Sequence, residues 1–462
     1  MRRIDLLAAE IGSTTTVVSA FDKLTTSDPV FLGQGVGSTT VVEGDVRIGL
    51  NAAMKDLSTR IGPFEPDRIA ATSSAAGGLV MTVHGLVYDM TVKAAKEAAL
   101  GAGGVIRMVT AGRIRPETAD EILEISPRII ILAGGVDYGE EEIVLENARL
   151  LATLPLSVPI VYAGNSAIQK QVSAILRAGG KEVLILPNVY PRIDELNIEP
   201  ARKLIVKLFE EKITQAPGMS HIKEMVNGHL KPTPGAVMDA AVLLQKTLGD
   251  LMVLDVGGAT TDVHSVAEGS SEIRDKMISP EPFAKRTVEG DLGVYINARN
   301  VAETAGLDAL QAATGLDPVS ELERLRPIPN DDGMRRFVEA LTLAAAKEAV
   351  NRHVGRIRYL YTPSGRVTVA SGKDLTTVKW IIGTGGALTR LDIGARLENA
   401  LRRRPETGEL LPELPQFLTD SDYILAAIGL IAEDYPDAAT ALMLNSFGMR
   451  RDINVSKSKT GD

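Results

Sequence analysis

The sequence predicts an α/β protein made of two related half-domains, with a doubly wound parallel sheet inserted into the first. Two short segments predict the relationship, EIGSTTT at 10–16 and DVGGATTD at 255–262. Each places an acidic residue, a glycine turn and Ser or Thr residues between two β-type runs. The insert is predicted because, from about Ala75, short apolar runs alternate regularly with helical patterns.

The composition limits the class of protein. With 462 residues, 45% of them hydrophobic, the chain is long enough for two to three domains. The net charge of −9 and the pI near 5.3 argue against a nucleic-acid or anionic-membrane partner, because both need a clustered basic face. The chain contains no cysteine, which excludes disulfides, thiolate nucleophiles and cysteine-held zinc or iron–sulfur clusters. Asp5 and Glu10 interrupt any signal-peptide core, so we expect a cytoplasmic protein.

The first half-domain begins with a predicted hairpin. Residues 4–22 indicate a strand, a turn at Gly12 and Ser13 and a second strand, because β-branched residues follow the turn. A third strand is expected near 31–35, a helix at 46–61 and a short strand at 68–72. These elements predict a mixed sheet.

The insert is expected at about 75–195. Four helical stretches separate its apolar runs, and strands that alternate with helices form a parallel sheet with right-handed crossovers. The five runs are LVMTVHGL, VIRMVTAG, RIIILAGG, PIVYAGN and EVLILPNVY. Helices are then expected at 199–213 and 236–248, before the second half-domain. The tail NVSKSKTGD is predicted to be disordered.

The two hairpin tips have the chemistry of a phosphate site. Glycine lets the main chain approach a phosphate closely, and successive N–H groups form a nest for an anion. The flanking carboxylates, Glu10 and Asp255, can hold a divalent cation through water. In a third segment, VKWIIGTGGALTRL at 378–391, a strand enters a glycine turn and a helix start, which suits a nucleoside and its phosphates.

Each of these segments is ambiguous alone. EIGSTTT by itself is more often a tight hairpin, and GTGGA can serve packing only. DVGGATTD is more specific, because two acids around a Gly-Gly turn have no evident packing role. Together and in this order the three segments predict a nucleotide site, and neither a P-loop nor a complete G-x-G-x-x-G pattern competes with them.

The ordered set EIGSTTT, LDVGGATTDV and IIGTGGALTRL resembles the two phosphate motifs and the adenosine motif of the acetate kinase, sugar kinase, heat-shock chaperone and actin superfamily. Within it the chain looks most like the MutL family, the accessory proteins of glutamate mutase and of ornithine degradation, unrelated to the mismatch-repair protein of that name. AEIGSTTTVV at 9–18, the AGG, YAGN and LPNVYPRID segments at 133–194 and KRTVEGDLGV at 285–294 carry this closer resemblance.

The resemblance implies an actin-like ATPase with two ribonuclease H-like lobes and an inserted flavodoxin-like domain. The implied division is 1–75 for the first part of lobe I, 76–195 for the insert, 196–249 for a helical return to lobe I, 250–420 for lobe II and 421–462 for a connecting helix and tail. A helix at 421–434 with small Ala426, Ala427 and Gly429 would permit close packing between the lobes.

The resemblance also implies a function: an ATP-dependent, chaperone-like factor that reactivates an adenosylcobalamin aminomutase by letting damaged cobalamin leave. ATP and Mg²⁺ are the implied cofactors, and the mutase is the implied partner. The resemblance leaves open whether the protein forms a homo-oligomer or a hetero-oligomer. The implied catalytic residues are Glu10, Asp255 and Asp262, with Glu10 and Asp255 on the metal. The implied nucleotide contacts are Gly12, Ser13, Thr14, Thr15, Gly257, Gly258, Thr260, Thr261, Gly383, Gly385 and Gly386.

Two departures qualify these expectations. Glu10 stands where the superfamily usually has Asp, so its longer side chain can slow ATP hydrolysis. The insert is similar to the cobalamin-binding domain of the mutases but lacks its Asp-x-His-x-x-Gly motif, because Thr82 precedes His84. We therefore expect the insert to contact the mutase, as a mimic of its cobalamin subunit, without a histidine on cobalt; a purely structural insert is the alternative.

Other readings of the sequence remain open. Glu289 and Asp291 are either solvated or near the nucleotide cleft, and His221, His229 and His353 lack metal-ligand spacing. A small-molecule kinase of the same superfamily is an alternative function, with Asp255 or Asp262 as its base. An electron-transfer activator would need cysteines, which the chain lacks. A filament-forming assembly protein would be obstructed by the insert.

Overall fold

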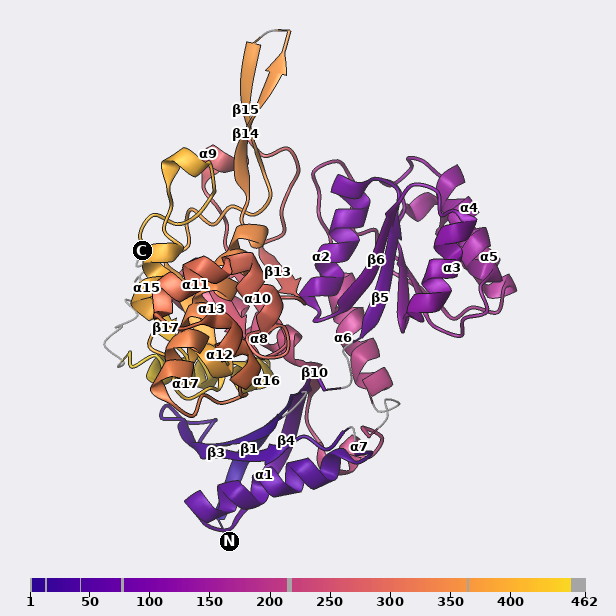
Figure 1. Ribbon diagram of the computed structural model, residues 1–462. Coiled ribbons are helices and arrows are strands. Elements are labelled where there is room, and N and C mark those ends of the chain that lie inside the picture. Colours follow the sequence, from indigo (N-terminus) through magenta and orange to yellow (C-terminus); the bar gives the residue numbers. More distant parts are fainter. Residues whose placement is uncertain are drawn as a thin grey trace, which may run out of the picture.

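The computed structural model describes residues 2–12, 15–41, 43–75, 79–213, 218–363 and 365–449. Lobe I contains a five-stranded sheet of order β10-β4-β1-β2-β3, in which β1 is antiparallel to β2 and parallel to β4. A helix, α1, packs across β3, as Figure 1 shows at the bottom of the molecule. The elements are β1 (Arg2–Ile11), β2 (Thr15–Asp22), β3 (Val30–Ser38), α1 (Val46–Ile61), β4 (Phe64–Ser73), α7 (Ile222–Met225) and β10 (Leu230–Pro232).

Lobe II repeats this topology. Its sheet has the order β13-β12-β11-β16-β17, with β11 antiparallel to β12 and parallel to β16, so β11 and β12 correspond to β1 and β2. The strands are β11 (Leu251–Val256), β12 (Thr261–Val266), β13 (Ala284–Glu289), β16 (Trp380–Thr384) and β17 (Gln416–Thr419). The helices are α9 (Ser271–Arg274), α10 (Ala298–Ala305), α11 (Leu307–Thr314), α12 (Pro318–Arg324), α13 (Asp332–His353), α14 (Gly385–Leu388) and α15 (Gly394–Ala400), with a 3₁₀ turn, η3 (Pro405–Thr407).

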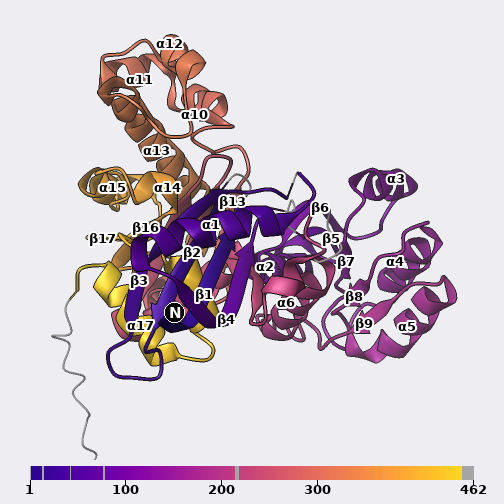
Figure 2. The same ribbon diagram turned by 90° about the horizontal axis from the view of Figure 1, so that it is seen from below.

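The insert is a third, wholly parallel sheet of order β6-β5-β7-β8-β9, set to the side of the lobes in both views (Figure 1, Figure 2). All five predicted strands are present, and each apolar run ends at a Gly, Asn or Pro. The three central strands are almost wholly buried, whereas β6 at one edge has no buried residue and β9 at the other edge has only Val183. Its elements are β5 (Val80–Gly85), η1 (Tyr88–Val92), α2 (Lys93–Gly101), β6 (Val105–Ala111), α3 (Pro116–Ile125), β7 (Ile129–Leu132), α4 (Glu142–Thr153), β8 (Ile160–Tyr162), η2 (Ser166–Ile168), α5 (Gln169–Ala178) and β9 (Val183–Ile185).

Four helices join these parts. Helix α6 (Glu199–Ile213) leads from the insert towards lobe I, and α8 (Thr233–Leu248) joins β10 to β11. Near the C-terminus α16 (Leu425–Ile431) and α17 (Pro436–Ser446) complete the described chain. Side chains of β1, α8, β11 and α16 share one apolar core between the two lobe sheets. The expected two-lobed α/β architecture with an inserted doubly wound parallel sheet is confirmed.

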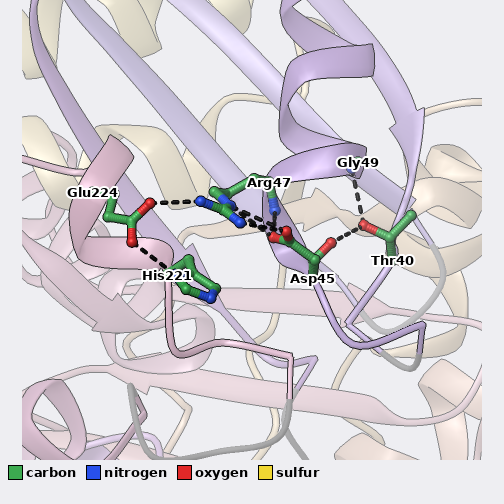
Figure 3. A network of polar contacts seen from close by, with 6 residues as sticks. All are labelled: Thr40, Asp45, Arg47, Gly49, His221 and Glu224. Atoms are coloured by element: carbon green, nitrogen blue, oxygen red, sulfur yellow. Dashed lines mark hydrogen bonds and ion pairs between the residues drawn. The ribbon is translucent and has the colours of Figure 1, made fainter.

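Helix α1 illustrates how the sequence sets an element boundary. Asp45 caps its N-terminus by accepting from the Arg47 backbone N–H at 2.9 Å, and Gly62 ends it at φ +83°. The Arg47 guanidinium also reaches Glu224 of α7 at 2.6 Å, and His221 lies 2.7 Å from the same carboxylate (Figure 3). Ion pairing with Arg47 lowers the pKa of Asp45 to about 2.

The structure also differs from the sequence-based expectations. The predicted helix 421–434 is shorter, because α16 begins only at Leu425 after a turn in which Tyr423 has φ +51°. The sequence patterns did not predict the helices between β13 and β14. They also missed a hairpin of β14 (Arg356–Thr362) and β15 (Gly365–Ser371). The predicted disordered tail lies outside the described residues. Within the described part of the chain, no helix combines the length and apolar character needed to cross a bilayer.

Candidate nucleotide-binding site

The two hairpin tips close in the same way. In lobe I the Gly12 N–H donates to the Thr15 carbonyl at 3.0 Å, and in lobe II the Gly257 N–H donates to the Thr260 carbonyl at 2.9 Å. A Cβ on Gly12 would lie only 2.9 Å from the Thr15 carbonyl oxygen, so the turn requires glycine there. The remaining predicted tip residues, Ser13 and Thr14, lie outside the described residues.

Glu10 lies near the end of β1, one residue before the last strand position. The Tyr423 hydroxyl, which comes from the turn before α16, donates to Glu10 Oε1 at 3.0 Å. Burial raises the pKa of Glu10 to about 7, although the Tyr423 hydrogen bond acts in the opposite direction. The carboxyl of lobe I is therefore held by the C-terminal segment of the chain.

Asp255 occupies the corresponding place in lobe II. Burial, then the negative charges of Asp262 and Glu10, raise the pKa of Asp255 to about 8. The carboxyls of the two lobes converge on one region. The turn at 420–423 contacts Glu10 through Tyr423, and through Asp420 it contacts Thr384, the neighbour of Asp255 in the β11–β16 ladder. Two partly buried carboxyls whose pKa values are both raised are a place where a cation would lower the free energy of the ionised forms.

The third predicted segment meets the second at Asp255. Gly385 has φ +84°, and a Cβ there would lie 2.4 Å from Asp255 Oδ1, so the glycine turn packs directly against the acid. Gly386 lines a cavity of about 130 Å³ together with Gly257 and Gly258. Gly383 differs, because it lies in β16 where a Cβ would meet the ring of Phe417 at 2.3 Å. The contacts of Gly383 are those of a packing residue.

The same cavity contains residues that the sequence reasoning missed. Tyr295, Arg326 and Arg390 line it beside the glycines. Tyr295 lies in the segment after β13, and its own backbone N–H donates to the Gly258 carbonyl at 2.9 Å. Two arginines at a glycine-lined cavity supply the positive charge that phosphate recognition needs. The isolated RP pair at 326–327 gave no periodic signal that would single out Arg326.

Asp420 is a second residue that was missed. It is fully buried and accepts hydrogen bonds from the backbone N–H groups of Ile424 and Leu425, at 3.0 and 2.9 Å. The hydroxyls of Thr384 and Ser446 donate to it at 3.0 Å. Asp420 thus links the strand that enters the glycine turn to α16. The short string TDSDY at 419–423, before a small-residue helix, was the available sequence signal.

Asp262 has a different environment from Asp255, although the two face each other across the β11–β12 ladder. Its Oδ1 accepts from Arg286 Nε at 2.9 Å and from Arg286 Nη2 at 2.6 Å. Arg286 is 3% exposed and also donates to the Leu100 carbonyl, at 3.1 Å, at the end of α2. The contacts of Asp262 are therefore those of an ion pair that ties lobe II to the insert, and its catalytic role stays a prediction.

The other predicted polar residues are placed as follows. The Thr261 hydroxyl is buried and donates to the Leu292 carbonyl at 2.6 Å, while Thr260 is partly exposed at the tip. Arg352 bridges Glu289 and Asp291, each at 2.8 Å. The segment that follows these acids packs on the β11–β12 tip through Val294, Tyr295, Ile296 and Asn297, and Asn297 also donates to the Gly290 carbonyl between the acids.

His84 in the insert does not have the environment of a metal ligand. Its ring nitrogens lie 2.8 Å from the Thr110 hydroxyl and 3.0 Å from the Thr82 hydroxyl. Burial lowers the pKa of His84 to about 4, so the ring is neutral. Among the described residues, no group of three or more His, Cys, Asp or Glu side chains is placed to hold a metal by itself.

A magnesium ion bound with a nucleotide fits this arrangement. Mg²⁺ usually keeps several waters and uses one or two carboxylates together with substrate phosphates. Glu10 and Asp255 would provide such a pair, one from each lobe, and the negative charge of Glu10 at Asp255 favours a bound cation. A three-carboxylate cage is not needed for this type of binding.

Comparisons with known proteins agree with the resemblance noted in the sequence. A family model described as MutL protein matches residues 6–447. Protein MutL of Clostridium tetanomorphum is 39% identical over 459 residues, which cover 95% of this chain and 98% of that protein. Among solved structures, a diol dehydratase-reactivating factor in its nucleotide-free form matches with 13% identity and a TM-score of 0.36, over 94% of this chain and 99% of that one.

A glycerol dehydratase reactivase matches with 11% identity and a TM-score of 0.33, over 93% of this chain and 99% of that one. Structural similarity this low carries no information about activity. The family model and the curated relative each span almost the whole chain, and on that ground the chain belongs to the MutL protein family.

Proposed function

We propose that this protein is an ATP-dependent reactivating factor for an adenosylcobalamin-dependent aminomutase of the glutamate mutase or ornithine aminomutase type. The observation that carries the ATP part is the convergence of Glu10 and Asp255 from equivalent hairpins of the two lobes. Membership of the MutL family supports the client part. We place the protein in the cytoplasm, where such a client would be found.

In this proposal each side of the site has its own role. The two hairpin tips, each closed by a glycine N–H bonded within its own turn, would bind the triphosphate from opposite lobes. The cavity lined by Gly386 and Tyr295 would take the nucleoside. Glu10 and Asp255 would hold Mg²⁺ through water, and the ion would neutralise phosphate charge. Hydrolysis would release the γ-phosphate that both tips contact, so that the lobes would separate.

The division of the chain follows from the same proposal. We assign residues 1–75 and 196–249 to lobe I, 76–195 to the insert, 250–420 to lobe II and 421–462 to the connecting helix and tail. Arg286 joins lobe II to α2, so a lobe movement would be felt by the insert. We propose that the insert contacts the mutase. Deletion of 75–195 should abolish mutase binding, and unchanged binding would exclude this contact.

The main experiment uses the client itself. An aminomutase inactivated by damaged cobalamin is incubated with the protein, Mg-ATP and fresh adenosylcobalamin, and recovery of mutase activity is measured. Recovery should require ATP and should be lost with Asp255→Asn. If neither a glutamate nor an ornithine aminomutase recovers, the client assignment is wrong.

A small-molecule kinase is the second candidate, and one observation favours it. An acid whose pKa is raised to about 8, as for Asp255, can act as a general base near neutral pH. A screen of carboxylates and sugars for ATP-dependent phosphorylation separates the two functions. A phosphorylated product would favour the kinase.

A further inference from the structure

The hairpin β14–β15 projects away from the body of lobe II, beyond every neighbouring element at the top of Figure 1. Its large apolar side chains are unusually open, because Tyr361 is 82% exposed, Tyr359 53%, Leu360 49% and Val367 45%. Within the described part of the chain, the two strands form a separate sheet without a third strand. A lone two-stranded ribbon is marginally stable in water, so this exposure calls for a partner.

The foot of this hairpin is firmly held. Helix α13 ends at His353, whose ring is buried and lies 2.8 Å from the Ser265 hydroxyl of β12 and 2.6 Å from the Thr287 hydroxyl of β13. The Ile357 N–H donates to the Gly408 carbonyl at 2.8 Å, and the Ala370 N–H donates to the Lys276 carbonyl at 2.7 Å. An anchored foot under an exposed tip fixes the direction in which the hairpin points.

The hairpin also has a charge opposite to that of the body. Residues 356–371 contain three arginines and no acidic residue, in a chain whose net charge is −9. Arg366 lies over the ring of Tyr359 at 4.5 Å from its centroid, which orients a guanidinium beside exposed aromatic surface. Tyrosine and arginine are the residues most enriched in the energetically dominant parts of protein interfaces.

We propose that the end of this hairpin is a docking element for the client enzyme. It would bind a patch on the client surface in which carboxylates surround an apolar depression. This inference rests on the proposed function. Tyr359 and Tyr361 would enter the depression, and Arg366 on the same face of the ribbon would pair with its carboxylates. Arg358, on the opposite face, would pair with a carboxylate at the rim. A second copy of this chain is disfavoured as the occupant, because two bodies of net charge −9 repel each other. Nucleic acid is disfavoured for the same reason.

The test measures binding of the full-length protein to an inactivated aminomutase. Two double variants are compared with the wild type, Tyr359→Ser with Tyr361→Ser and Arg358→Glu with Arg366→Glu. Each should weaken binding and slow reactivation by roughly tenfold or more, as expected for interface hot spots. ATP hydrolysis without client and the thermal unfolding midpoint should equal those of the wild type, because these side chains are exposed and distant from the glycine tips. Added salt should weaken wild-type binding more than that of the arginine variant.

Ile48→Ser is the matched control, because Ile48 is a 56% exposed apolar side chain on α1 in the other lobe. It should bind the client as the wild type does. Wild-type affinity and reactivation in both double variants would overturn the hairpin assignment and leave the proposed function intact. Failure of the wild type to bind or reactivate any aminomutase would overturn the proposed function, and the hairpin assignment with it. A loss of self-association or of nucleic-acid binding in the variants, with client binding unchanged, would assign the hairpin to another partner.

Discussion

At the scale of single residues, burial and neighbouring negative charges raise the pKa of Asp255 far above its ordinary value. Its pKa is raised from 3.8 to about 8, so the native nucleotide-free protein binds a proton that the unfolded chain releases at lower pH. This proton contributes fully to the free energy of unfolding below pH about 4. The contribution is lost as the pH rises towards 8, by at most about 1.4 kcal/mol for each pH unit. Asp255→Asn should therefore unfold at a higher denaturant concentration than the wild type at pH 8, with a smaller difference at pH 5. An equal difference at both pH values would contradict the assigned environment.

Glu10 offers a test of side-chain length. Asp at this position would withdraw the carboxylate from the Tyr423 hydroxyl, which now lies 3.0 Å from it, and would leave more room for a hydrated cation. We expect Glu10→Asp to raise ATP turnover severalfold in a phosphate-release assay, and Glu10→Gln to lower it. Tyr423→Phe is the control that removes the hydrogen bond alone. Slower turnover in Glu10→Asp would show that the longer acid is required.

At the scale of elements, the glycine turn that leads into α14 allows a matched pair of substitutions. Gly385 has a left-handed φ of +84° and no room for a Cβ, whereas a Cβ on Gly386 meets no atom within 4 Å. Gly385→Ala should destabilise the protein by about 1–3 kcal/mol, because a strained backbone and a clash with Asp255 add together. Gly386→Ala should change stability by much less, as measured by denaturant unfolding. Similar losses in both variants would mean that the turn is not held against Asp255.

The β12–β13 ladder is tied to the insert by Arg286. The guanidinium is 2% exposed and its partner Asp262 is 11% exposed, so removal of one member leaves a buried charge unpaired. Arg286→Met should cost about 3–5 kcal/mol by this reasoning. The double variant Asp262→Asn with Arg286→Met should recover much of that loss in a double-mutant cycle. Additive losses would mean that the two side chains do not act as a pair.

At the scale of the whole molecule, the sequence predicted what depends on local patterns. The strands of the insert follow from short apolar runs that alternate with helical patterns, and α6 lies at the predicted 199–213 because its apolar spacing is helical throughout. Helix 421–434 was predicted too long, because the left-handed Tyr423 and the fully buried Asp420 are set by contacts with Glu10 and Thr384, which are remote in sequence. Arg326 and Arg390 were missed for the same reason, since only the fold brings them to the cavity.

The two lobes meet through α8 and α16, and this contact decides how they can move relative to each other. The sequence predicted that small residues near 426–429 allow close packing, and this is confirmed, because a Cβ on Gly429 would lie 1.9 Å from the Ala236 carbonyl oxygen. That oxygen belongs to the backbone of α8, so a methyl group at 429 can be accommodated only if one helix shifts.

Gly429→Ala should therefore separate α8 from α16 and hold the lobes in an altered relative orientation. We expect the free energy of unfolding to fall by about 1–3 kcal/mol. We also expect a clear loss of ATP hydrolysis, although no nucleotide-facing atom is changed. Small-angle scattering with and without Mg-ATP would measure the change in shape directly. Gly448→Ala is a positional control on the same C-terminal segment, because a Cβ there meets no atom within 4 Å, although its φ of +72° carries some strain. If Gly429→Ala hydrolyses ATP at the wild-type rate and closes by the same amount, the α8–α16 contact does not control the lobes.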